Sequence, residues 1–332
     1  MTWQFDIVES TRTLARPLVT AAGEIRARRA MVLQVKDQDE IIAQGECSPL
    51  PAFSADTYTA CRAHAEQWLD APAHNIEQWH QRAQQLAHLP ALRCAVQTLI
   101  SKLADHTHTA LDGWPKPART RVRVNALAHD AQSAQERVQD GFRVLKIKVG
   151  AAPLRDDVQR IQQIRRAVGD TITLRLDANR AWSYDDASNA VEALAPSRIA
   201  LLEEPLRAGG AQALAQLRTQ SPIPLAADEQ ARNAQQIQEL IDKKSVDAIV
   251  LKPMLVGGPM TCLQLAHYAH QRGVYSIITT TIDGPIATQM AVQTAARLPD
   301  DRAHGLGTAL LFQDQRGFPP LVDGHIDLGA CA

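Results

Sequence analysis

The feature of the sequence that most constrains its fold is a regular alternation of two patterns between residues 121 and 309. Short apolar runs, typical of buried strands, alternate with stretches of helical periodicity. The strand-like runs are RVRVNALA, RVLKIKVG, TLRLDANR, IALLEEP, PLAADE, AIVLKP, YSIITTT and AHGLGTA. Eight strands separated by seven helices favour parallel β/α units that close into a barrel.

An open doubly wound sheet is the alternative fold for such an alternation. That fold favours a glycine-rich phosphate-binding turn after an early strand, and the sequence contains no GxGxxG motif. We therefore expect an α/β protein with a barrel of the TIM type. The earlier part of the chain differs from it: residues 1–50 alternate like strands, residues 55–106 read as amphipathic helices, and residues 111–120 are typical of a linker.

The composition argues against several classes of partner. The chain has 332 residues, of which 45% are hydrophobic and 21% are charged, and its formal net charge is −1. A nearly neutral chain gives no electrostatic reason to expect nucleic acid or an anionic membrane as a partner, and we interpret RARRA at 26–30 as a solvated hairpin face. No apolar run approaches the roughly 18 residues of a membrane span.

The first residues and the cysteines indicate a cytoplasmic protein. MTWQFDIVES has no basic start followed by an apolar stretch, so we expect no signal peptide. The five cysteines are an odd number without CxxC spacing. Such usage fits reduced thiols in the cytoplasm better than a disulfide framework or a zinc site.

Five charged side chains stand where successive strand-like runs end. They are Lys148, Asp177, Glu203, Asp228 and Lys252, spaced 24 to 29 residues apart. One such charge per β/α unit, always at the carboxyl end of the strand, places all five around one mouth of the barrel, where barrel enzymes keep their active sites. Taken singly, each acid also reads as a helix cap or a loop acceptor, but their common register favours a site.

Lys146 precedes Lys148 by two residues and therefore points to the same face of its strand. Two neighbouring cations require anionic partners, and the three carboxylates supply them. Three oxygen ligands on successive strands suit Mg²⁺, with Mn²⁺ as the alternative, and the absence of histidine and cysteine from these positions disfavours zinc. A lysine at each end of the array favours removal of a proton α to a carboxylate, with Lys146 keeping Lys148 in its neutral form.

These motifs resemble the enolase superfamily and, within it, the muconate lactonizing enzyme subgroup. The matching motifs are K-x-K at 146–148, D-A-N at 177–179, E-E-P at 203–205, D-E at 228–229 and K-P at 252–253. The resemblance covers nearly the whole chain. It implies an N-terminal α+β capping domain over residues 1–115, completed by residues 312–332, and a (β/α)7β barrel over residues 120–311.

The resemblance also implies roles for the charged residues. Asp177, Glu203 and Asp228 correspond to the metal ligands of the superfamily, and Lys148 and Lys252 to its acid/base lysines. The catalytic set is completed by the neighbouring Lys146.

Two further stretches resemble one family of this subgroup, the o-succinylbenzoate synthases: GECSPLPAFSADTY at 45–58 and LRLDANRAW at 174–182. This resemblance implies dehydration of 2-succinyl-6-hydroxy-2,4-cyclohexadiene-1-carboxylate to o-succinylbenzoate in menaquinone or phylloquinone biosynthesis. Lys148 would remove the α proton and return it to the departing hydroxide. Lys252 would face the ring from the other side and stabilise the enediolate.

Other residues at the barrel mouth are expected to bind the substrate. Arg175 shares the inward face of its strand with the metal ligand that follows it, and we expect it to hold the succinyl group. TTT at 279–281 and GLGT at 305–308 close the mouth from the last two strands. We expect their hydroxyls and amides, those of Thr280, Thr281 and Gly307 above all, to bind carboxylate oxygens. Hydrogen bonding at the barrel end explains each of these residues equally well when taken alone.

The N-terminal part is expected to supply a lid. Loops such as SPLPAFS at 48–54 are of the kind that close over barrel mouths. We expect Pro51, Phe53 and the segment 19–24 to contact substrate without performing chemistry.

A racemase or epimerase of the same subgroup, acting on N-acylamino acids or dipeptides, is the alternative enzyme. Dipeptide epimerases usually carry Asp-x-Asp on the last strand to hold the substrate ammonium, whereas this chain has Gly-Leu-Gly-Thr at 305–308. N-acylamino acid racemisation stays open because the lysine pair suits 1,1-proton transfer. A third alternative is a barrel retained as a binding or scaffold protein. Such a protein would have no need of all five charged positions, and here none of them is missing. The expected partner is a small-molecule carboxylate, and the sequence leaves the oligomeric state open.

Overall fold

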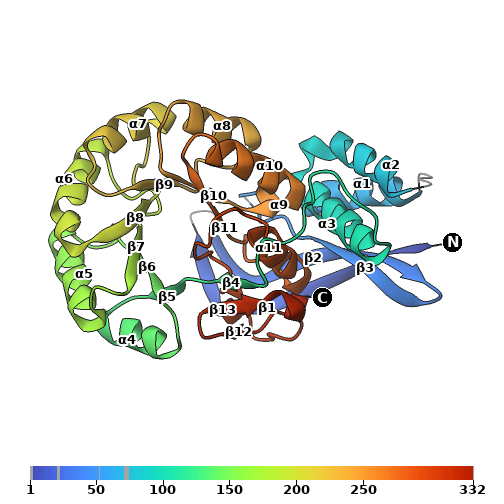
Figure 1. Cartoon of the computed structure of the whole chain (residues 1–332), viewed down its shortest axis with the longest axis horizontal. Coiled ribbons are helices and arrows are strands. Elements are labelled where there is room, and N and C mark those ends of the chain that lie inside the picture. Colours follow the sequence, from blue (N-terminus) through green and yellow to red (C-terminus); the bar gives the residue numbers. More distant parts are fainter. Residues whose placement is uncertain (1–2, 21–22, 52, 71–74, 332) are drawn as a thin grey trace.

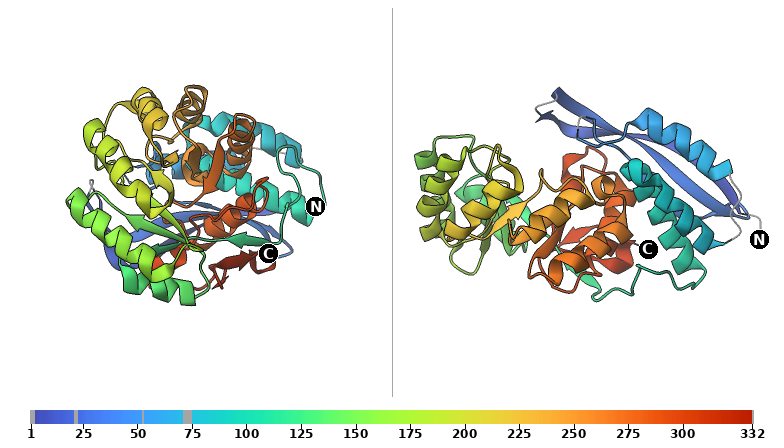
Figure 2. Two further views of the ribbon diagram at one scale, coloured as in Figure 1. Left: turned by 60° about the vertical axis from the view of Figure 1, so that its left-hand side comes forward. Right: turned by 90° about the horizontal axis from the view of Figure 1, so that it is seen from above.

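The computed structural model describes residues 3–20, 23–51, 53–70 and 75–331. These residues form an α/β fold of two parts that lie next to each other along the long axis of the molecule (Figure 1). One part is a curled parallel sheet with helices around its outer side, and the other is an N-terminal antiparallel sheet with helices packed against it (Figure 2). The α/β class and the mixed N-terminal part expected from the sequence are confirmed.

Within the described residues, the parallel sheet has seven strands in the order β11-β10-β9-β8-β7-β6-β5. They are β5 (Ala126–Ala128), β6 (Val144–Lys148), β7 (Thr173–Asp177), β8 (Ile199–Glu203), β9 (Leu225–Ala227), β10 (Ala248–Leu251) and β11 (Tyr275–Ile278). The helices between and after them are α4 (Ala131–Gln139), α5 (Leu154–Val168), α6 (Tyr184–Leu194), α7 (Gly210–Gln220), α8 (Ala234–Asp242), α9 (Pro253–Val256), α10 (Pro259–His270) and α11 (Pro285–Ala295). Helices α4 to α8 follow the outer side of the sheet in an arc (Figure 1).

Side-chain caps define where several of these helices begin. Asp130, Ser183 and Asn233 stand directly before α4, α6 and α8, and each accepts a hydrogen bond from the backbone N–H three residues later. These bonds satisfy amides that have no partner inside the helix. The helices therefore start close to the strand ends, and the connecting loops lie at the mouth of the curled sheet.

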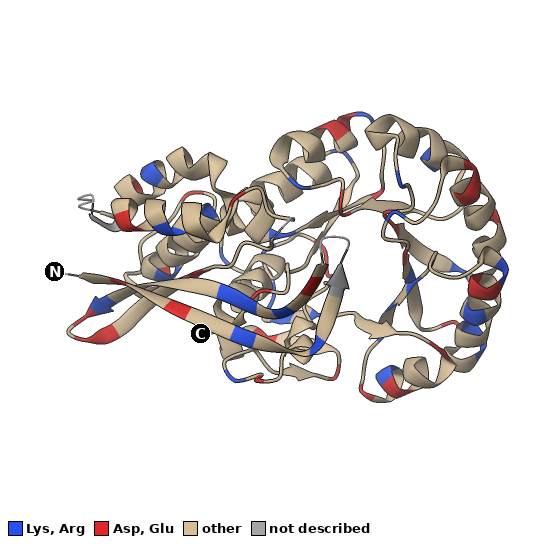
Figure 3. Cartoon of the chain, turned by 180° about the vertical axis from the view of Figure 1, so that it is seen from behind, with Lys and Arg blue, Asp and Glu red and all other residues tan. Residues whose placement is uncertain are grey.

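Residues along the strands alternate between two environments. Leu145 and Ile147 belong to the apolar core between the sheet and the helices. On the other face, inside the curve, Leu201, Ala226 and Val250 belong to a smaller apolar cluster. The charged residues of the sequence motifs have the spacing of this inward face. Figure 3 shows charges spread over the outer helices and others on strands inside the curve.

The segment around residue 304 connects the two edges of the parallel sheet. It forms parallel bridges from His304 to Val124 and from Gly305 to Thr279. The imidazole Nδ1 of buried His304 also accepts a hydrogen bond of 3.1 Å from the N–H of Ile278. Residues 303–305 therefore hydrogen-bond to both ends of the sheet, at the place where the sequence predicts the eighth strand.

The expected strand at 121–128 is divided in two. Its first half, β4 (Arg121–Arg123), does not join the parallel sheet but pairs antiparallel with β13 (His325–Asp327), which in turn pairs with β12 (Leu321–Val322). Only the second half, β5, lies in the parallel sheet. The single strand expected here is therefore wrong, because the first half finds its partner near the C-terminus.

The N-terminal sheet consists of β1 (Gln4–Thr20), β2 (Gly23–Asp37) and β3 (Glu40–Cys47), which pair antiparallel in that order. Three α-helices pack beside it: α1 (Tyr58–Asp70), α2 (Ile76–Ala83) and α3 (Pro90–His106). Helix α3 approaches β3 so closely that a Cβ on Gly45 would lie 1.9 Å from the carbonyl oxygen of Ala95. Glycine is required there because any side chain would separate the helix from the sheet.

The hairpin face that carries RARRA is only partly solvated. Arg26 and Arg29 are exposed, but Arg28 is 4% exposed. The expectation of a solvated run is therefore wrong for Arg28, because this side of β2 faces the parallel-sheet part rather than water.

The remaining features concern the C-terminal segment, the thiols and the helices. Phe312 bridges to Leu14 of β1, so the C-terminal segment touches the N-terminal sheet as well as β4.

The five cysteines are all buried, unpaired thiols. None of the helices in the described residues is long and apolar enough to cross a membrane.

Candidate active site

The five charged residues of the sequence motifs lie together at the carboxyl ends of β6 to β10. Lys148 is opposite Asp177 in the register of β6 and β7, and Asp177 is opposite Glu203 in that of β7 and β8. Asp228 and Lys252 directly follow β9 and β10. Carboxyl ends of adjacent parallel strands meet at one edge, so the spacing in the sequence becomes proximity in space.

Lys146 lies between two of the carboxylates. Its Nζ is 2.8 Å from Oδ2 of Asp177 and 2.7 Å from Oε1 of Glu203. Burial alone would lower the pKa of Lys146, but Glu203, Asp177 and Asp228 outweigh it and raise the pKa above its usual range. Lys146 is therefore a fixed cation that holds two acids together.

Lys252 has a different environment on the opposite side of the carboxylates. Its Nζ lies 2.5 Å from Oδ1 of Asp228, and its side chain is 12% exposed. The ring of Phe53, from the loop after β3, lies 5.1 Å from this Nζ. The same ring lies 4.8 Å from the guanidinium carbon of Arg232. The ammonium of Lys252 is thus enclosed by a carboxylate and an aromatic ring.

Two adjoining cavities open at this edge of the sheet. The outer cavity, about 390 Å³, is lined by Asn125, Ala126, Leu127, His129, Arg137, Phe142, Lys146, Lys148, Asp177, Thr279, Gly305, Gly307, Thr308, Leu310, Leu311 and Leu321. The inner cavity, about 150 Å³, is lined by Asn125, Lys146, Arg175, Glu203, Asp228, Val250, Lys252, Ile277, Thr279, Thr280 and Gly305. Four residues belong to both walls, so the cavities are neighbouring halves of one site.

The residues expected to bind substrate are distributed between these halves. Arg175 lines the inner cavity and donates from Nη1 to the carbonyl of Ala303 at 2.8 Å; burial lowers its pKa. Thr280 also lines the inner cavity, and Gly307 lines the outer one. Thr281 lines neither, because its hydroxyl donates to the carboxylate of Asp283.

The expected lid residues are only partly described. Phe53 reaches the site, as its contact with Lys252 indicates. Pro51 is exposed. Residues 21–22, in the middle of the segment 19–24, lie outside the described residues.

Sequence reasoning missed one polar residue that lines both cavities, Asn125, whereas Thr279 was expected at the mouth and also lines both. An asparagine inside the apolar run RVRVNALA was the available signal for Asn125. Thr279 begins the TTT motif and donates to the carbonyl of Gly305 at 2.7 Å. Both residues stand where the segment 303–305 meets the parallel sheet.

Glu204, the second acid of E-E-P, is a further residue whose role the motif did not reveal. It is fully buried and has a left-handed φ of 45°. Its carboxylate accepts hydrogen bonds from the N–H of Asp228 at 2.7 Å and from Nε2 of Gln230 at 2.8 Å. Burial raises the pKa of Glu204 to about 7. Glu204 therefore fixes the backbone that carries Asp228, and the strained backbone allows consecutive glutamates to point in different directions.

The three carboxylates and the lysines paired with them decide whether the site fits a metal ion. Among the described residues, no three His, Cys, Asp or Glu side chains converge closely enough to hold an ion as they stand. The lysines account for this, since Lys146 separates Asp177 from Glu203 and Lys252 engages Asp228. Despite Lys146, burial and then the neighbouring Asp177 and Asp228 raise the pKa of Glu203, so a third negative charge is unfavourable there unless a further cation balances the excess. Oxygen donors with excess negative charge fit Mg²⁺.

Comparison with known proteins defines the class to which this fold and site belong. Residues 129–329 match the family described as "Enolase C-terminal domain-like". The match covers more than half of the chain, and the chain therefore belongs to this family. The resemblance to the enolase superfamily inferred from the charged motifs is confirmed.

Individual relatives carry two different activities in their names. An o-succinylbenzoate synthase from Yersinia pseudotuberculosis is 31% identical over 298 residues, which cover 88% of this chain and 85% of the relative. A hydrophobic dipeptide epimerase from Enterococcus faecalis is 29% identical over 325 residues, 92% of both chains. The sequence comparisons leave both activities in consideration.

Solved structures give the same picture of the fold. Dipeptide epimerase from Enterococcus faecalis, complexed with Mg and the dipeptide L-Leu-L-Tyr, superposes with a TM-score of 0.85 and 26% identity, covering 98% of this chain and 96% of the other. Muconate lactonizing enzyme from Pseudomonas fluorescens, complexed with muconolactone, superposes with a TM-score of 0.82 and 20% identity over 98% and 93% of the two chains. The second likeness concerns the fold alone.

Proposed function

We propose that this chain is an o-succinylbenzoate synthase. In this reaction 2-succinyl-6-hydroxy-2,4-cyclohexadiene-1-carboxylate loses water and becomes o-succinylbenzoate, a precursor of menaquinone or phylloquinone. The proposal rests first on the charges of the outer cavity. Among the described residues that line it, Lys146, Lys148 and Arg137 are cationic and Asp177 is the one carboxylate.

This balance of charge favours a substrate with two carboxylates and no ammonium group. The apolar part of the same wall, with Leu310, Leu311 and Phe142, fits a carbocyclic ring. Asp177 is already engaged by Lys146, so a dipeptide ammonium would find no unpaired carboxylate among the described residues of this wall. Unpaired ammonium groups in a partly buried site are costly.

The chemistry requires one base on one face of the ring. We assign proton removal at the α carbon to Lys148, whose neutral amine takes the proton and then gives it to the departing hydroxide as water forms. Lys148 ends β6, lines the outer cavity and is exposed to it. General base and general acid are thus the same nitrogen, in two successive steps.

Lys252 and the carboxylates have electrostatic roles in this proposal. Lys252 is paired with Asp228 and faces the negative charge that develops on the substrate. Asp177, Glu203 and Asp228 would hold Mg²⁺ or Mn²⁺, with Lys146 as their fixed counter-charge. When bound, the metal supplies positive charge to the substrate carboxylate.

Binding of the substrate oxygens is assigned to both cavities. We propose that Arg175 and Thr280 contact the substrate from the inner cavity, and that the backbone of Gly307 does so from the outer one. Phe53 covers the site from the loop after β3. Thr281 is not included, because its hydroxyl donates to Asp283.

The same proposal covers the architecture and the cellular location. We propose a (β/α)7β barrel over residues 120–311, with 303–305 counted as its eighth strand, and a capping domain over residues 1–115 completed by 312–332. The buried, unpaired thiols fit a reducing cytoplasm.

Dipeptide epimerisation is the second candidate, because a hydrophobic dipeptide epimerase is 29% identical over 92% of this chain. N-acylamino acid racemisation is the related form without an ammonium group. Either reaction uses two lysines on opposite faces of the α carbon. That requirement fits Lys252 poorly, since its ammonium is held by Asp228 beneath Phe53.

A direct comparison of substrates tests the proposal. Purified protein with Mg²⁺ is assayed with the cyclohexadiene carboxylate, with hydrophobic dipeptides and with N-acylamino acids, the last two by deuterium exchange at the α carbon. We expect kcat/KM for dehydration to exceed the others by at least about 100-fold. Faster turnover of a dipeptide or of an N-acylamino acid would overturn the assignment.

A further inference from the structure

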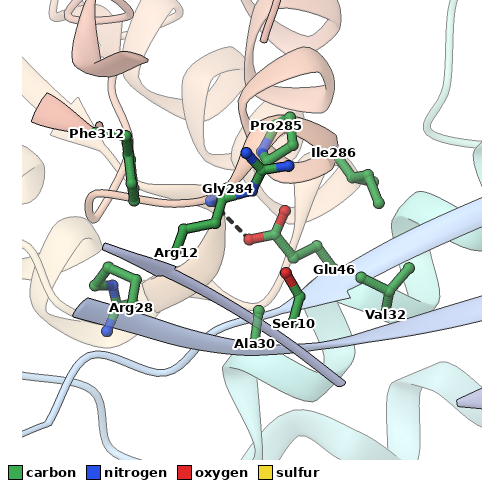
Figure 4. Close-up of a pocket in the computed structure, with 10 residues that line it drawn as sticks. All are labelled: Ser10, Arg12, Arg28, Ala30, Val32, Glu46, Gly284, Pro285, Ile286 and Phe312. Atoms are coloured by element: carbon green, nitrogen blue, oxygen red, sulfur yellow. Dashed lines mark hydrogen bonds between the residues drawn. The ribbon is translucent and has the colours of Figure 1, made fainter. Parts of the chain in front are cut away.

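Arg28 is a buried arginine whose hydrogen bonds join two loops of different parts of the molecule. Its Nε donates to the carbonyl of Ile282 at 3.0 Å, and its Nη1 donates to the carbonyl of Pro49 at 3.2 Å. Its Nη2 donates to the carbonyl of Ser48. The side chain thus spans from β2 to the loop after β3 and to the loop after β11. Figure 4 shows Arg28 among the residues of a pocket that Glu46 and Gly284 also line.

Each of these loops carries residues of the candidate active site. The loop 48–54 ends beside Phe53, whose N–H donates to the carbonyl of Leu50 at 3.0 Å and whose ring covers Lys252. The loop 279–284 begins with Thr279 and Thr280, which line the inner cavity. Arg28 touches neither cavity and acts on both loops through backbone carbonyls.

The loop after β11 is strained at the residue that Arg28 contacts. Ile282 has a left-handed φ of 60°, which is unfavourable for a β-branched side chain. Such a conformation persists only where the surroundings hold it. The bond from Arg28 to the carbonyl of Ile282 is one of those restraints, and Asp283, which accepts from Thr281, is another.

A second contact between the same two parts lies beside Arg28. The buried carboxylate of Glu46, on β3, accepts hydrogen bonds from the N–H of Gly284 at 2.6 Å and of Ala287 at 3.3 Å, at the start of α11 (Figure 4). A Cβ on Gly284 would lie 2.5 Å from Oε1 of Glu46. Glu46 therefore holds the end of the loop 279–284, and Arg28 holds its middle.

We propose that Arg28 is a positioning residue that couples the loop 48–54 to the loop 279–284 and so fixes Phe53 against Lys252 and Thr280 in the wall of the inner cavity. An arginine suits this task because its planar guanidinium offers five donors in a fixed geometry, whereas a lysine offers one flexible ammonium. Burial of an arginine is costly, and three carbonyl acceptors together with the nearby acids Glu46 and Asp283 offset that cost.

The first measurement needs no substrate, so its result is independent of the proposed function. Hydrogen–deuterium exchange of Arg28→Met is compared with that of the parent and of Arg29→Met, a matched control. Arg29 is exposed and paired with Glu9 at 2.9 Å. We expect the amides of Leu50, Phe53 and Ser54 and of the segment 281–284 to exchange about 10-fold faster in Arg28→Met alone. Uniformly faster exchange over the whole protein, or no faster exchange in these two segments, overturns the coupling.

The second measurement rests on the proposed function and uses dehydration kinetics. We expect Arg28→Met to raise KM about 10-fold and to lower kcat less than 3-fold, because Phe53 and Thr280 bind substrate without reacting. In a Phe53→Ala background the same substitution should raise KM clearly less than 10-fold, since only its effect through the loop of Thr280 remains. Additive effects, or an unchanged KM with a lower melting temperature, contradict the proposal.

A conservative variant distinguishes the loss of the three hydrogen bonds from simple misfolding in both measurements. Arg28→Lys retains the charge but reaches fewer carbonyls, so we expect exchange and KM between those of the parent and Arg28→Met. Parent-like values in Arg28→Lys would mean that the charge, and not the three hydrogen bonds, matters. That result would overturn the coupling of the two loops.

Discussion

The two lysines at the ends of the carboxylate array differ in what surrounds them. Lys148 lines the wide outer cavity, and no hydrogen bond or ion pair of its ammonium is found within the described part of the chain. Lys252 lies against Asp228 and beneath Phe53 at the narrower inner cavity. In the sequence both lysines simply stand at the end of a strand-like run. The fold, however, gives Lys148 room for a substrate and gives Lys252 a fixed counter-ion.

This difference bears on the kind of reaction that the site performs. Transfer of a proton from one face of a carbon to the other requires two lysines with similar access. Elimination of water requires one base and a stabilised negative charge. The unequal surroundings of Lys148 and Lys252 therefore favour dehydration, and four experiments test the comparison, beginning with the largest expected effect.

Replacement of Lys148 is expected to have the largest effect. Lys148→Ala removes the proton acceptor, and we expect dehydration to fall by about four orders of magnitude. Exchange of the substrate's α proton with solvent deuterium should disappear as well. Lys252→Ala should also lose dehydration severely but retain that exchange, because Lys148 still removes the proton.

Proton NMR in deuterium oxide measures this exchange, and Lys243→Ala serves as the control, since Lys243 pairs with Glu239 on an outer helix. Exchange that survives in Lys148→Ala and disappears in Lys252→Ala would mean that the roles of the two lysines are reversed.

Loss of a carboxylate from the inner half should have the next largest effect. Asp228→Asn removes the partner of Lys252 and one of the proposed metal ligands. We expect Mg²⁺ affinity, measured by calorimetry, to fall at least about 100-fold and dehydration about 1,000-fold. Asp242→Asn, on the exposed pair with Arg272, is the matched control. Parent-like activity of Asp228→Asn, or of protein treated with a chelator, would refute the metal assignment.

Removal of the aromatic cover should have a smaller effect. Phe53→Ala exposes the ammonium of Lys252 to water but leaves the reacting groups in place. We expect KM to rise about 10-fold, with kcat falling less than about 3-fold, because cation–π contacts and covering surface contribute chiefly to binding. Steady-state kinetics distinguish this outcome from its opposite, an unchanged KM with a lost kcat, which would give Phe53 a role in chemistry.

The fourth experiment concerns the stability of the protein and leaves the reacting groups untouched. Burial and the nearby Asp283 raise the pKa of Glu46 to about 7 from its ordinary value of 4.5. Between these values the folded protein keeps a proton that the unfolded chain has lost, so the free energy of unfolding falls as pH rises from about 4.5 to 7. Glu46→Gln lacks this proton uptake, and its stability relative to the parent should rise across that window by up to about 3 kcal/mol.

Denaturant unfolding at pH 5 and pH 8 measures the difference between Glu46→Gln and the parent. The exposed hairpin variant Glu40→Gln is the control. A difference that is constant with pH would contradict the raised pKa of Glu46.

The sequence predicted the arrangement wherever its pattern follows from local geometry. Period-two alternation in VLKIK and the regular spacing of Asp177, Glu203 and Asp228 give the inward face and the shared mouth, because a strand presents alternate residues to one side. The same rule could not reveal that Lys146 pairs with two acids while Lys148 pairs with none among the described residues. That distinction depends on distances across strands, which no single strand encodes.

Long-range partners explain the remaining errors. Arg28 was expected to be solvated because it stands in the short basic run RARRA, and only the approach of the loop around Ile282 buries it. The run RVRVNALA looked like one strand because nothing within it signals that β4 pairs with β13, two hundred residues later. Thr281 resembled its neighbour Thr280, but the left-handed turn at Ile282 brings Asp283 to its hydroxyl.

The connection of the two sheet edges by residues 303–305 has a consequence for synthesis of the protein on the ribosome. Strands β5 to β11 emerge in order, yet the two edges of their sheet keep unpaired backbone groups until His304 and Gly305 are released. Open strand edges pair readily with other chains, so the nascent protein is prone to aggregation during this interval. The interval ends only when residues 303–305 are released, and a chain interrupted before residue 303 would remain in that exposed state.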